Sequence, residues 1–436
     1  MLLTTLMFSL LSRLAASSAF SRFDFSWNTV ATQAFPGASN RFMTHNELLH
    51  FTNFSSLMIW GINATCLDPK DNTTTFPAYC FGSWCQCYPE GSDEPLESQR
   101  FVTNMEESLQ AQGAALKAAV AAAGLPPRPI LGYVDHMSPQ QYFAGQNALR
   151  EDPALGSYLA RLEWLQGEPI DCMNASRGGC CEQGSEFGIY DFGNPAVVKY
   201  YAENVIGPLI DGVGLDGTFL DSIDWALTFG CGNRWICTDA EKDGLVNGSL
   251  AALDAALTYA AGHKKLLSVS GHSNLFFGAW YYEAQIALIA KHGNAWRFYE
   301  GFSVDTHHMA TYLYEAQGLN ISSGNGTPSD TNYSVPVMVH FYDAPVYAPD
   351  WLQLAAFLIG ANENSYFSSS GGWAFTSFTI FPEYSQPLGL PLGKPTVSTV
   401  GSMTTYAREY EHCSVVLTED SNGVWNATLG CKPIHI

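Results

Sequence analysis

An aspartate closes a short apolar run that is typical of a buried strand. In this run, LDGTFLDS at 215 to 222, side chains alternate, so Phe219 and Asp221 share one face. A carboxylate in such a place loses hydration unless it is hydrogen-bonded or used in chemistry. Asp216 stands where the strand begins, which favours a structural role, and Asp224 lies in the loop that follows. Of the three acids, Asp221 is therefore the catalytic candidate, with a capping or ion-paired carboxylate as the alternative.

A glutamate is reached by the same alternation further along the chain. In WRFYEGF, at 296 to 302, Phe298 and Glu300 share a face, and Glu300 precedes a glycine. If both runs belong to one barrel, we expect Asp221 and Glu300 to face each other across the same opening. Glycoside hydrolysis needs two such acids, because one attacks or stabilises the anomeric carbon while the other protonates the leaving oxygen. The pair predicts a glycoside hydrolase.

Eight short apolar runs alternate with helix-like stretches, a pattern typical of parallel βα units. Eight such units predict an α/β fold, a (β/α)8 TIM barrel, in which catalytic groups stand at the carboxyl ends of the strands. A doubly wound open sheet is the alternative, although no G-x-G-x-x-G or phosphate-binding loop follows the first run. The expected strands lie at 27 to 35, 56 to 63, 128 to 136, 215 to 222, 265 to 271, 296 to 302, 335 to 342 and 364 to 370.

Two of the intervening stretches are strong helix candidates. At 194 to 211 the sequence offers Asn194 as a cap and Pro195 for the first turn, followed by apolar residues spaced four apart. The alanine-rich stretch at 107 to 124 closes with Gly124, a residue that commonly ends helices. Helices of this kind are what a barrel needs on its outer face.

The two ends of the chain differ from this pattern. Residues 1 to 19 are apolar and end in small residues, as a secretory signal peptide does. Residues 20 to 395 would form the catalytic barrel with disulfide-rich loops. Residues 396 to 436 alternate as antiparallel strands do, with Asn422 and Gly423 as a hairpin turn, which predicts a small C-terminal β-hairpin appendage.

Other polar and aromatic residues near the expected strand ends are candidates for binding a sugar. Asp135 and His272 end strands that neighbour the Asp221 strand, and His340 lies near the end of the seventh. Sugar rings stack on aromatic faces, which makes Trp225 and Trp373 candidates for such a contact. For each of these residues the structural alternative is a locally satisfied polar group or an aromatic core residue. Further polar candidates near strand ends are Asp224, His136, Asp343 and Asn362 to Asn364.

Composition favours the secretory pathway. Nine N-x-S/T sequons without proline and eleven cysteines fit an N-glycosylated, disulfide-bonded chain in an oxidising compartment. Cys413 and Cys431 flank the expected hairpin and could pair across it, whereas the clusters Cys66/Cys80/Cys85/Cys87 and Cys172/Cys180/Cys181 leave their connectivity open. The sequon asparagines are Asn53, Asn63, Asn72, Asn174, Asn247, Asn320, Asn325, Asn332 and Asn426.

The charge and the hydropathy exclude several partners. A net charge of -21 argues against nucleic acid and anionic membranes. After the first 19 residues no apolar run reaches the roughly 18 residues of a membrane span. The residues of a hypothetical metal site would be Asp216, Asp221, Asp224, His272 and His307 or His308, but no zinc or calcium motif has the right spacing. No G-x-S-x-G nucleophile elbow is present either. We therefore expect a secreted or extracellular protein with no metal and no cofactor.

Three stretches carry a resemblance to a known family: 190 to 224, 352 to 373, and 383 to 395 followed by YAREYEHCSVVL. They are similar to hypothetical glycosyl hydrolase family fifteen, a group of glycosyl-hydrolase-like (β/α)8 barrels that is distantly similar to endo-α-1,4-polygalactosaminidases and α-galactosidase-type barrels. The resemblance covers most of residues 25 to 420. It implies that Asp221 is the nucleophile and Glu300 the acid/base. The cysteine-bearing insertions depart from the compact family pattern, which leaves the shape of the substrate pocket open.

These observations predict a secreted glycoside hydrolase that cleaves the O-glycosidic bonds of a poly- or oligosaccharide with retention at the anomeric centre. The sequence does not name the sugar, the linkage or the oligomeric state. A second class stays open, a catalytically inactive, lectin-like barrel that binds carbohydrate, because a fold does not by itself imply activity.

Overall fold

A computed structural model provides the structure of the chain. It describes residues 20–23, 25–36, 41–60, 65–68, 70, 73–77, 79–81, 84–87, 102, 104–136, 143–151, 159–160, 163–164, 189–221, 223, 235–236, 239–271, 279–321, 327–328, 333–342, 350–370 and 379–431.

The eight expected strands all form, and they build one sheet in chain order. The pairs that can be followed residue by residue are parallel, and a parallel bridge from Thr32 to Phe367 links the segment before the first strand to the last one. This is the sheet of a (β/α)8 barrel, as predicted, and the doubly wound alternative is wrong because its strand order would reverse. The strands are β1 (Gln33–Ala34), β2 (Ser56–Ile59), β7 (Ile130–Asp135), β11 (Gly217–Asp221), β13 (Leu266–Ser270), β14 (Ala295–Tyr299), β17 (Val337–Phe341) and β18 (Tyr366–Ser369).

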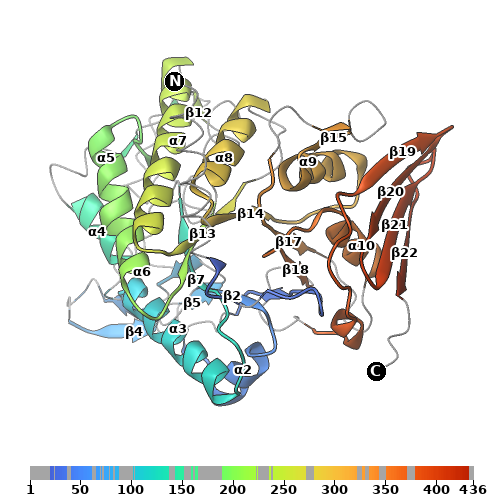
Figure 1. Cartoon of the computed structure of the whole chain (residues 1–436). Coiled ribbons are helices and arrows are strands. Elements are labelled where there is room, and N and C mark those ends of the chain that lie inside the picture. Colours follow the sequence, from blue (N-terminus) through green and yellow to red (C-terminus); the bar gives the residue numbers. More distant parts are fainter. Residues whose placement is uncertain are drawn as a thin grey trace, which may run out of the picture. The chain divides into compact units, whose positions relative to one another are not determined.

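Helices follow most of these strands, as Figure 1 shows. Shorter strands pair in small antiparallel sheets within the connecting segments. The helices are α2 (His45–Phe51), α3 (Met105–Ala122), α4 (Ala144–Glu151), α5 (Pro195–Tyr200), the π-helix η4 (Tyr201–Ile206), α6 (Gly207–Asp211), α7 (Asp239–Gly262), α8 (Ala279–His292), α9 (Thr306–Gln317), α10 (Trp351–Gly360) and the 3-10 turn η6 (Pro382–Ser385). The small strands are β3 (Thr65–Leu67), β4 (Thr75–Pro77), β5 (Tyr79–Phe81), β6 (Trp84–Gln86), β8 (Leu159–Ala160), β9 (Glu163–Trp164), β10 (Ile189–Tyr190), β12 (Trp235–Ile236), β15 (Leu319–Asn320) and β16 (Thr327–Pro328).

The chain packs as two compact units. The β2–β13 unit comprises residues 35 to 52 and 57 to 288. The β14–β22 unit comprises residues up to 34, 53 to 56, and 289 to 436. These units cut across the expected boundaries at 19/20 and 395/396, so the division into signal peptide, barrel and appendage stays a prediction.

Both strong helix candidates are confirmed in the β2–β13 unit. The side chain of Asn194 accepts the backbone N–H of Ala196 at 2.9 Å, and Pro195 opens α5 as expected. The same stretch then widens into the π-helix η4 before α6, which the four-residue spacing did not predict. The alanine-rich helix is α3; Gly124 follows it with φ +67°, the left-handed conformation that suits glycine.

The two faces of β7 can be told apart by their neighbours. A Cβ on Gly132 would lie 2.7 Å from a methyl of Leu215 and 3.6 Å from a methyl of Leu109 on α3, so this residue faces the helix layer. Because side chains alternate along a strand, Tyr133 and Asp135 lie on the opposite face, away from α3. This opposite face is the one on which a barrel places its catalytic groups.

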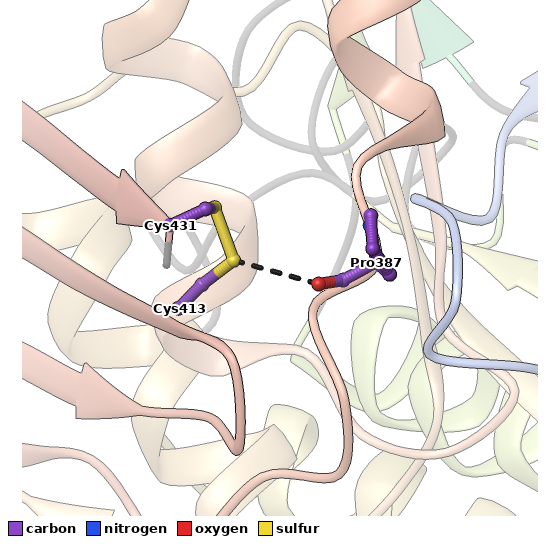
Figure 2. The surroundings of a disulfide bond; sticks show 3 residues. All are labelled: Pro387, Cys413 and Cys431. Atoms are coloured by element: carbon purple, nitrogen blue, oxygen red, sulfur yellow. Dashed lines mark hydrogen bonds between the residues drawn. A yellow bond between two sulfur atoms is a disulfide. The ribbon is translucent and has the colours of Figure 1, made fainter. Parts of the chain in front are cut away.

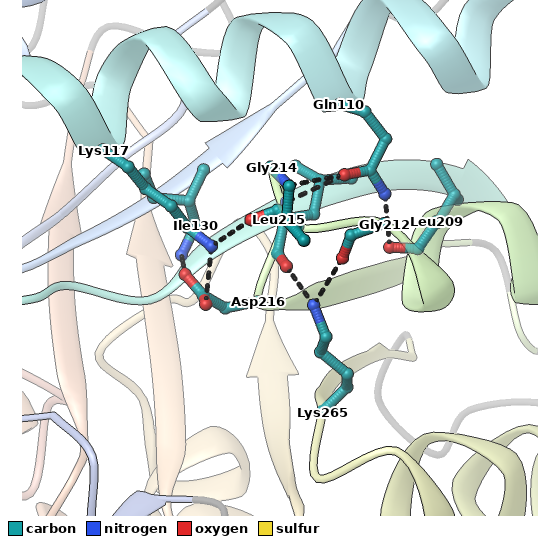
Figure 3. A network of polar contacts seen from close by, with 10 residues as sticks. Gln110, Lys117, Ile130, Leu209, Gly212, Gly214, Leu215, Asp216 and Lys265 are labelled. Carbon is teal, nitrogen blue, oxygen red and sulfur yellow. Dashed lines mark hydrogen bonds and ion pairs between the residues drawn. The ribbon is translucent and has the colours of Figure 1, made fainter.

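The amino end of β11 is fixed by ionic contacts to neighbouring elements (Figure 3). Asp216, which is buried, accepts hydrogen bonds from Lys117 Nζ at 2.9 Å and from the backbone N–H of Ile130 at 3.1 Å. Lys265 Nζ donates to the carbonyls of Gly212 at 2.8 Å and Leu215 at 2.5 Å. These contacts tie α3, β7 and the segment before β13 to the turn that precedes β11. The expected structural role of Asp216 is confirmed.

In the β14–β22 unit, the outer face of β14 carries a buried ion pair. Arg297 Nε lies 3.4 Å from a carboxylate oxygen of Glu315 on α9, and the Tyr299 hydroxyl donates to the same carboxylate. Both charged side chains are at most 2 % exposed, so each compensates the other's lost hydration. Since Arg297 and Tyr299 face α9, the alternating residues Phe298 and Glu300 lie on the other face.

The C-terminal segment forms the expected antiparallel structure, with two strands more than a hairpin. Its four strands are drawn in red in Figure 1 and comprise β19 (Thr396–Val400), β20 (Met403–Glu409), β21 (Cys413–Glu419) and β22 (Trp425–Cys431). The buried guanidinium of Arg408 donates to the carbonyls of Leu358 at 3.3 Å and Ile359 at 3.2 Å, in the last turn of α10. A cation at a helix C-terminus satisfies free carbonyls and favours the helix dipole.

Two disulfide bonds lie within the described part of the chain. Cys413 and Cys431 stand opposite each other at the open end of β21 and β22 and are bonded, as the sequence suggested (Figure 2). Cys413 Sγ lies 3.7 Å from the carbonyl of Pro387, so the bridge also contacts the segment that leads into the sheet. Cys66 pairs with Cys87, which settles one connection in the first cysteine cluster. No helix among the described residues is long and apolar enough to cross a membrane.

Candidate active site

Asp221 is the last residue of β11 and is held by a neighbouring tyrosine. The hydroxyl of Tyr133, on β7, donates a hydrogen bond of 2.9 Å to Asp221 Oδ2. The ring of Tyr133 stacks on that of Phe219, two residues before Asp221, with centroids 5.8 Å apart. The stacked rings form an apolar floor under the carboxylate, and the hydroxyl fixes its direction. Asp221 is only half-buried, as a group that meets a substrate must be.

Asp135 stands directly beside Asp221. The parallel register of β7 and β11 sets Asp135 opposite Asp221 and Tyr133 opposite Phe219, so all four side chains share the inner face. Adjacent strands lie about 4.8 Å apart, which makes the two carboxyl groups close neighbours. Trp60, which follows β2, extends the aromatic floor with its ring 5.9 Å from that of Tyr133. The β2–β13 unit therefore presents two acids above a layer of three aromatic rings.

The backbone hydrogen bonds between β7 and β11 continue past the last residues of the two strands. The N–H of His136 donates to the carbonyl of Asp221 at 2.9 Å, one residue beyond the regular ladder. The His136 side chain is fully buried on the helix side, and burial lowers its pKa to about 3, which keeps the imidazole neutral. His136 therefore does not offer its ring to the inner face, contrary to what its position after a strand end suggested.

In the β14–β22 unit, Glu300 follows the last residue of β14 and is held by a tyrosine in the same manner. The hydroxyl of Tyr342, which follows β17, donates to Glu300 Oε1. Gly301 makes this contact possible: its φ is +60°, and a Cβ there would lie 2.7 Å from the Tyr342 ring. The glycine that marks the end of the Glu300 strand thus provides space for the tyrosine that orients the carboxylate.

His340 lies in β17 on the same face as Glu300. In the parallel register Phe298 is opposite Met338, so Glu300 and His340 follow two residues later on neighbouring strands. The His340 ring packs edge-on against Tyr342 with centroids 4.9 Å apart, and its Nε2 lies 2.8 Å from Ser370 Oγ. Burial lowers the pKa of His340 to about 3, so the ring is neutral there. His340 supports Tyr342, and through it Glu300.

Residues 129 to 414 match hypothetical glycosyl hydrolase family 15, a range that is more than half of the chain. The chain belongs to this family. The matched range contains Asp135, Asp221, Glu300 and His340, all of them described above. No curated protein matches the chain.

Several solved structures are similar to this family member at low sequence identity. The Ega3 protein of Aspergillus fumigatus, in complex with galactosamine, is 10% identical over 82% of this chain and 99% of that chain, with a TM-score of 0.40. An α-N-acetylgalactosaminidase, NagBb of Bifidobacterium bifidum, is 8% identical over 96% of this chain and 60% of that chain, also at 0.40. The old yellow enzyme of Trypanosoma cruzi is 10% identical over 78% of this chain and 84% of that chain, at 0.36.

Several expected site residues lie outside the described part of this family member. They are Asp224, Trp225, His272, Asp343 and Trp373. Asn362 and Asn364 are described, and they precede β18 at the amino ends of the strands. Asn362 Nδ2 donates to the carbonyl of Val335 at 3.1 Å, and the carbonyl of Asn364 accepts from Trp296 Nε1 at 2.7 Å. These two asparagines therefore have local structural roles.

Sequence reasoning missed the residues that orient the two acids. Tyr133 and Tyr342 were not singled out, although each lies on the inner face by the alternation used for Asp135 and His340. The missing information was the register between neighbouring strands. Among the residues that the structure describes, no three His, Cys, Asp or Glu side chains gather as a metal site would require.

Proposed function

We propose that this chain is a retaining glycoside hydrolase in which Asp221 is the nucleophile and Glu300 the general acid/base. Family membership supports the reaction class. Two observations support the assignment. Asp221 is the last residue of β11 and Glu300 directly follows β14, both on the inner face. Each acid accepts a hydrogen bond from a tyrosine on the neighbouring strand or just beyond it. Carboxylates of structural ion pairs, such as Asp216, stand instead at the amino end.

In the proposed reaction, Asp221 attacks the anomeric carbon while Glu300 gives its proton to the leaving glycosidic oxygen. A covalent glycosyl ester forms on Asp221, and the aglycone departs as an alcohol. Glu300, now a carboxylate, takes a proton from water, whose oxygen attacks the anomeric carbon and releases Asp221. Tyr133 would hold Asp221 in line, and Tyr342 would aim Glu300. Asp135 would bind a hydroxyl of the sugar bound above the aromatic floor.

The proposed substrate is a poly- or oligosaccharide outside the cell, whose O-glycosidic bonds the enzyme cleaves. The sequons and the two disulfide bonds support a secreted, N-glycosylated protein, with residues 1 to 19 as a signal peptide. Sequon asparagines with exposed side chains include Asn53, Asn320 and Asn426. Trp225 and Trp373 would add stacking contacts, and Asp224 and His272 further hydrogen bonds to the sugar.

A glycan panel tests this proposal. Wild type should release reducing ends from at least one glycan, and Asp221→Asn and Glu300→Gln should each lower kcat by more than about 100-fold. The exposed Glu203→Gln is the matched control and should keep full activity. Proton NMR of the first product would show the starting anomeric configuration. Inverted product would overturn retention, and binding without turnover by wild type would identify a lectin-like protein instead.

A further inference from the structure

A fully buried polar cluster lies behind the Asp221 strand end, on its helix side. His136 Nδ1 is 2.9 Å from the hydroxyl of Tyr201, the first residue of the π-helix η4, and Nε2 is 3.4 Å from Ser249 Oγ on α7. All three residues are 0% exposed. Side chains from the residue after β7, from η4 and from α7 thus meet in one fully buried place.

The cluster ends on the backbone just after Asp221. Ser249 Oγ and the hydroxyl of Tyr281, on α8, are 3.1 Å apart, and each lies 3.3 Å from the carbonyl of Ile223. Ile223 is two residues beyond Asp221, whose own carbonyl accepts the His136 N–H. Three groups therefore hold the turn after β11: one backbone amide and two hydroxyls.

Among the described contacts of this hydrogen-bonded cluster, one arrangement of protons gives every donor an acceptor. The Tyr201 hydroxyl donates to His136 Nδ1, His136 Nε2–H donates to Ser249 Oγ, and Ser249 donates to the Ile223 carbonyl. If Nδ1 also carried a proton, it would donate to the Tyr201 oxygen. The hydroxyl hydrogen of Tyr201 would then have no acceptor among the described contacts. In this arrangement the imidazole is neutral and carries its proton on Nε2.

The surrounding sequence is shaped to bring these groups together. A Cβ on Gly248 would lie 2.4 Å from the backbone carbon of Phe192, so only glycine lets α7 approach closely enough to insert Ser249. The widened turn of η4 begins at Tyr201, and such π-helical turns are frequent at functional sites. The rings of Phe192 and Tyr201 pack on His136, and the ring of Tyr190 packs on both of them. Asp135 and Glu106 are the nearby acids: Asp135 acts on both tyrosines and Glu106 on Tyr190.

We infer that His136 is a positioning residue for Asp221: its neutral ring completes the buried chain from Tyr201 to the Ile223 carbonyl and thereby fixes the turn that sets the direction of the Asp221 carboxylate. This inference rests on the proposed function for its catalytic consequence. Its structural consequence is that the 2.9 Å hydrogen bond from Tyr133 to Asp221 depends on an intact cluster. The ring itself does not touch the substrate.

Crystal structures of wild type and Tyr281→Phe, grown under the same conditions, measure the structural part. Loss of the Tyr281 hydroxyl should lengthen the Tyr133–Asp221 contact beyond 3.5 Å. The matched control is Tyr312→Phe, which removes an equally buried hydroxyl that donates to the carbonyl of Phe357 at 2.7 Å in the other unit. An unchanged Tyr133–Asp221 contact in Tyr281→Phe would overturn the inference, whether or not the protein is active.

Kinetics on a glycan that wild type cleaves measure the catalytic part. Tyr281→Phe should lower kcat by about 10- to 100-fold with little change in KM, because misplacing a reacting group costs this much. Tyr312→Phe, with a comparable loss of Tm, should keep kcat. His136→Gln, which can keep a donor near the position of Nε2, should retain more kcat than His136→Phe. Equal kcat in Tyr281→Phe and Tyr312→Phe would overturn the inference. A wild type without activity on any glycan would instead defeat the proposed function, while the crystallographic distance still decides the positioning.

Discussion

The hydroxyl of Tyr133 donates a 2.9 Å hydrogen bond to Oδ2 of Asp221, from one strand to the next across the inner face of the sheet. This contact makes the orientation of the proposed nucleophile depend on a residue 88 positions away in sequence. In Tyr133→Phe the aromatic floor stays and the donor is lost. We expect kcat to fall by about 10-fold, equivalent to about 1.4 kcal/mol, with Tm nearly unchanged.

Comparing Tyr133→Phe with Tyr133→Ala separates the orienting effect of the hydroxyl from the packing of the ring. Tyr133→Ala removes the ring as well as the hydroxyl, and should lower Tm in addition to kcat because it leaves a cavity beside Phe219 and Trp60. Steady-state kinetics and thermal unfolding on both variants provide the comparison. A Tyr133→Phe enzyme with wild-type kcat would show that the hydroxyl does not assist Asp221.

The role of Glu300 can be tested through the leaving group. An acid/base variant, Glu300→Gln, should cleave natural glycans very slowly, yet it should still release an activated aryl leaving group that needs no proton. The drop in kcat/KM, which reports the step in which the aglycone leaves, should therefore shrink from more than about 100-fold on a natural glycan to less than about 10-fold on an aryl glycoside of the same sugar. Asp221→Asn should be equally slow on both substrates. An equal loss for Glu300→Gln on both would argue against its role as the acid.

The strands were predictable because each is short, apolar and alternating, and because these patterns depend only on neighbouring residues. Asp221 is the last residue of β11, and Glu300 is the first residue after β14, so both acids lie at the strand ends that the alternation indicated. Contacts between strands were not predictable in this way. Tyr133 and Tyr342 reach the two acids through the register of neighbouring strands, which hydrophobic pattern alone does not determine.

Other features followed from backbone geometry that a pattern does not encode. The helix expected at 194 to 211 contains the π-helix η4. Apolar residues four apart are equally compatible with an α-helix, so the spacing could not reveal the wider turn. The pairing of Cys66 with Cys87 likewise depends on how β3 and the segment after β6 approach each other.

Gly301 should be essential for the Tyr342–Glu300 contact. Alanine at φ +60° costs about 1–2 kcal/mol in backbone energy, and its Cβ would also lie 2.7 Å from the Tyr342 ring. Gly301→Ala should therefore lower both stability and kcat. The control is Gly401→Ala, at φ +63° with no atom within 4 Å of the added Cβ, which should lose only the backbone energy and keep activity. Urea unfolding and kinetics on the two variants measure the difference, and similar kcat values for both would contradict the predicted effect on Glu300.

Asp216 should matter for stability and not for catalysis. Asp216→Asn weakens a partly buried ion pair with Lys117 and its hydrogen bond from Ile130, for which we expect a loss of roughly 1–3 kcal/mol in unfolding free energy. The surface pair of Lys199 and Glu203 is exposed, so Glu203→Gln should cost less than about 1 kcal/mol. Denaturant titration measures both losses. A fall in kcat of Asp216→Asn at a temperature where it is fully folded would give Asp216 a part in the site after all.

The two buried histidines should make the protein less stable as pH falls. His136 and His340 have a pKa of about 3 in the folded protein, whereas an unfolded chain titrates them near 6.5. Between these values the unfolded state binds more protons, so the stability contributed by each neutral ring is complete above pH 6.5 and is lost as pH falls. Each histidine should contribute a slope of about 1.4 kcal/mol per pH unit at full effect.

Two buried glutamates act on stability in the opposite direction. Burial raises the pKa of Glu106 and Glu315, and the resulting pH dependence of stability is the same in wild type and in histidine variants. The difference between wild type and His136→Gln in unfolding free energy at pH 5 and pH 7 therefore isolates one histidine. A difference that does not change with pH would mean that His136 is protonated in the folded protein, and would contradict the neutral hydrogen-bond chain behind Asp221.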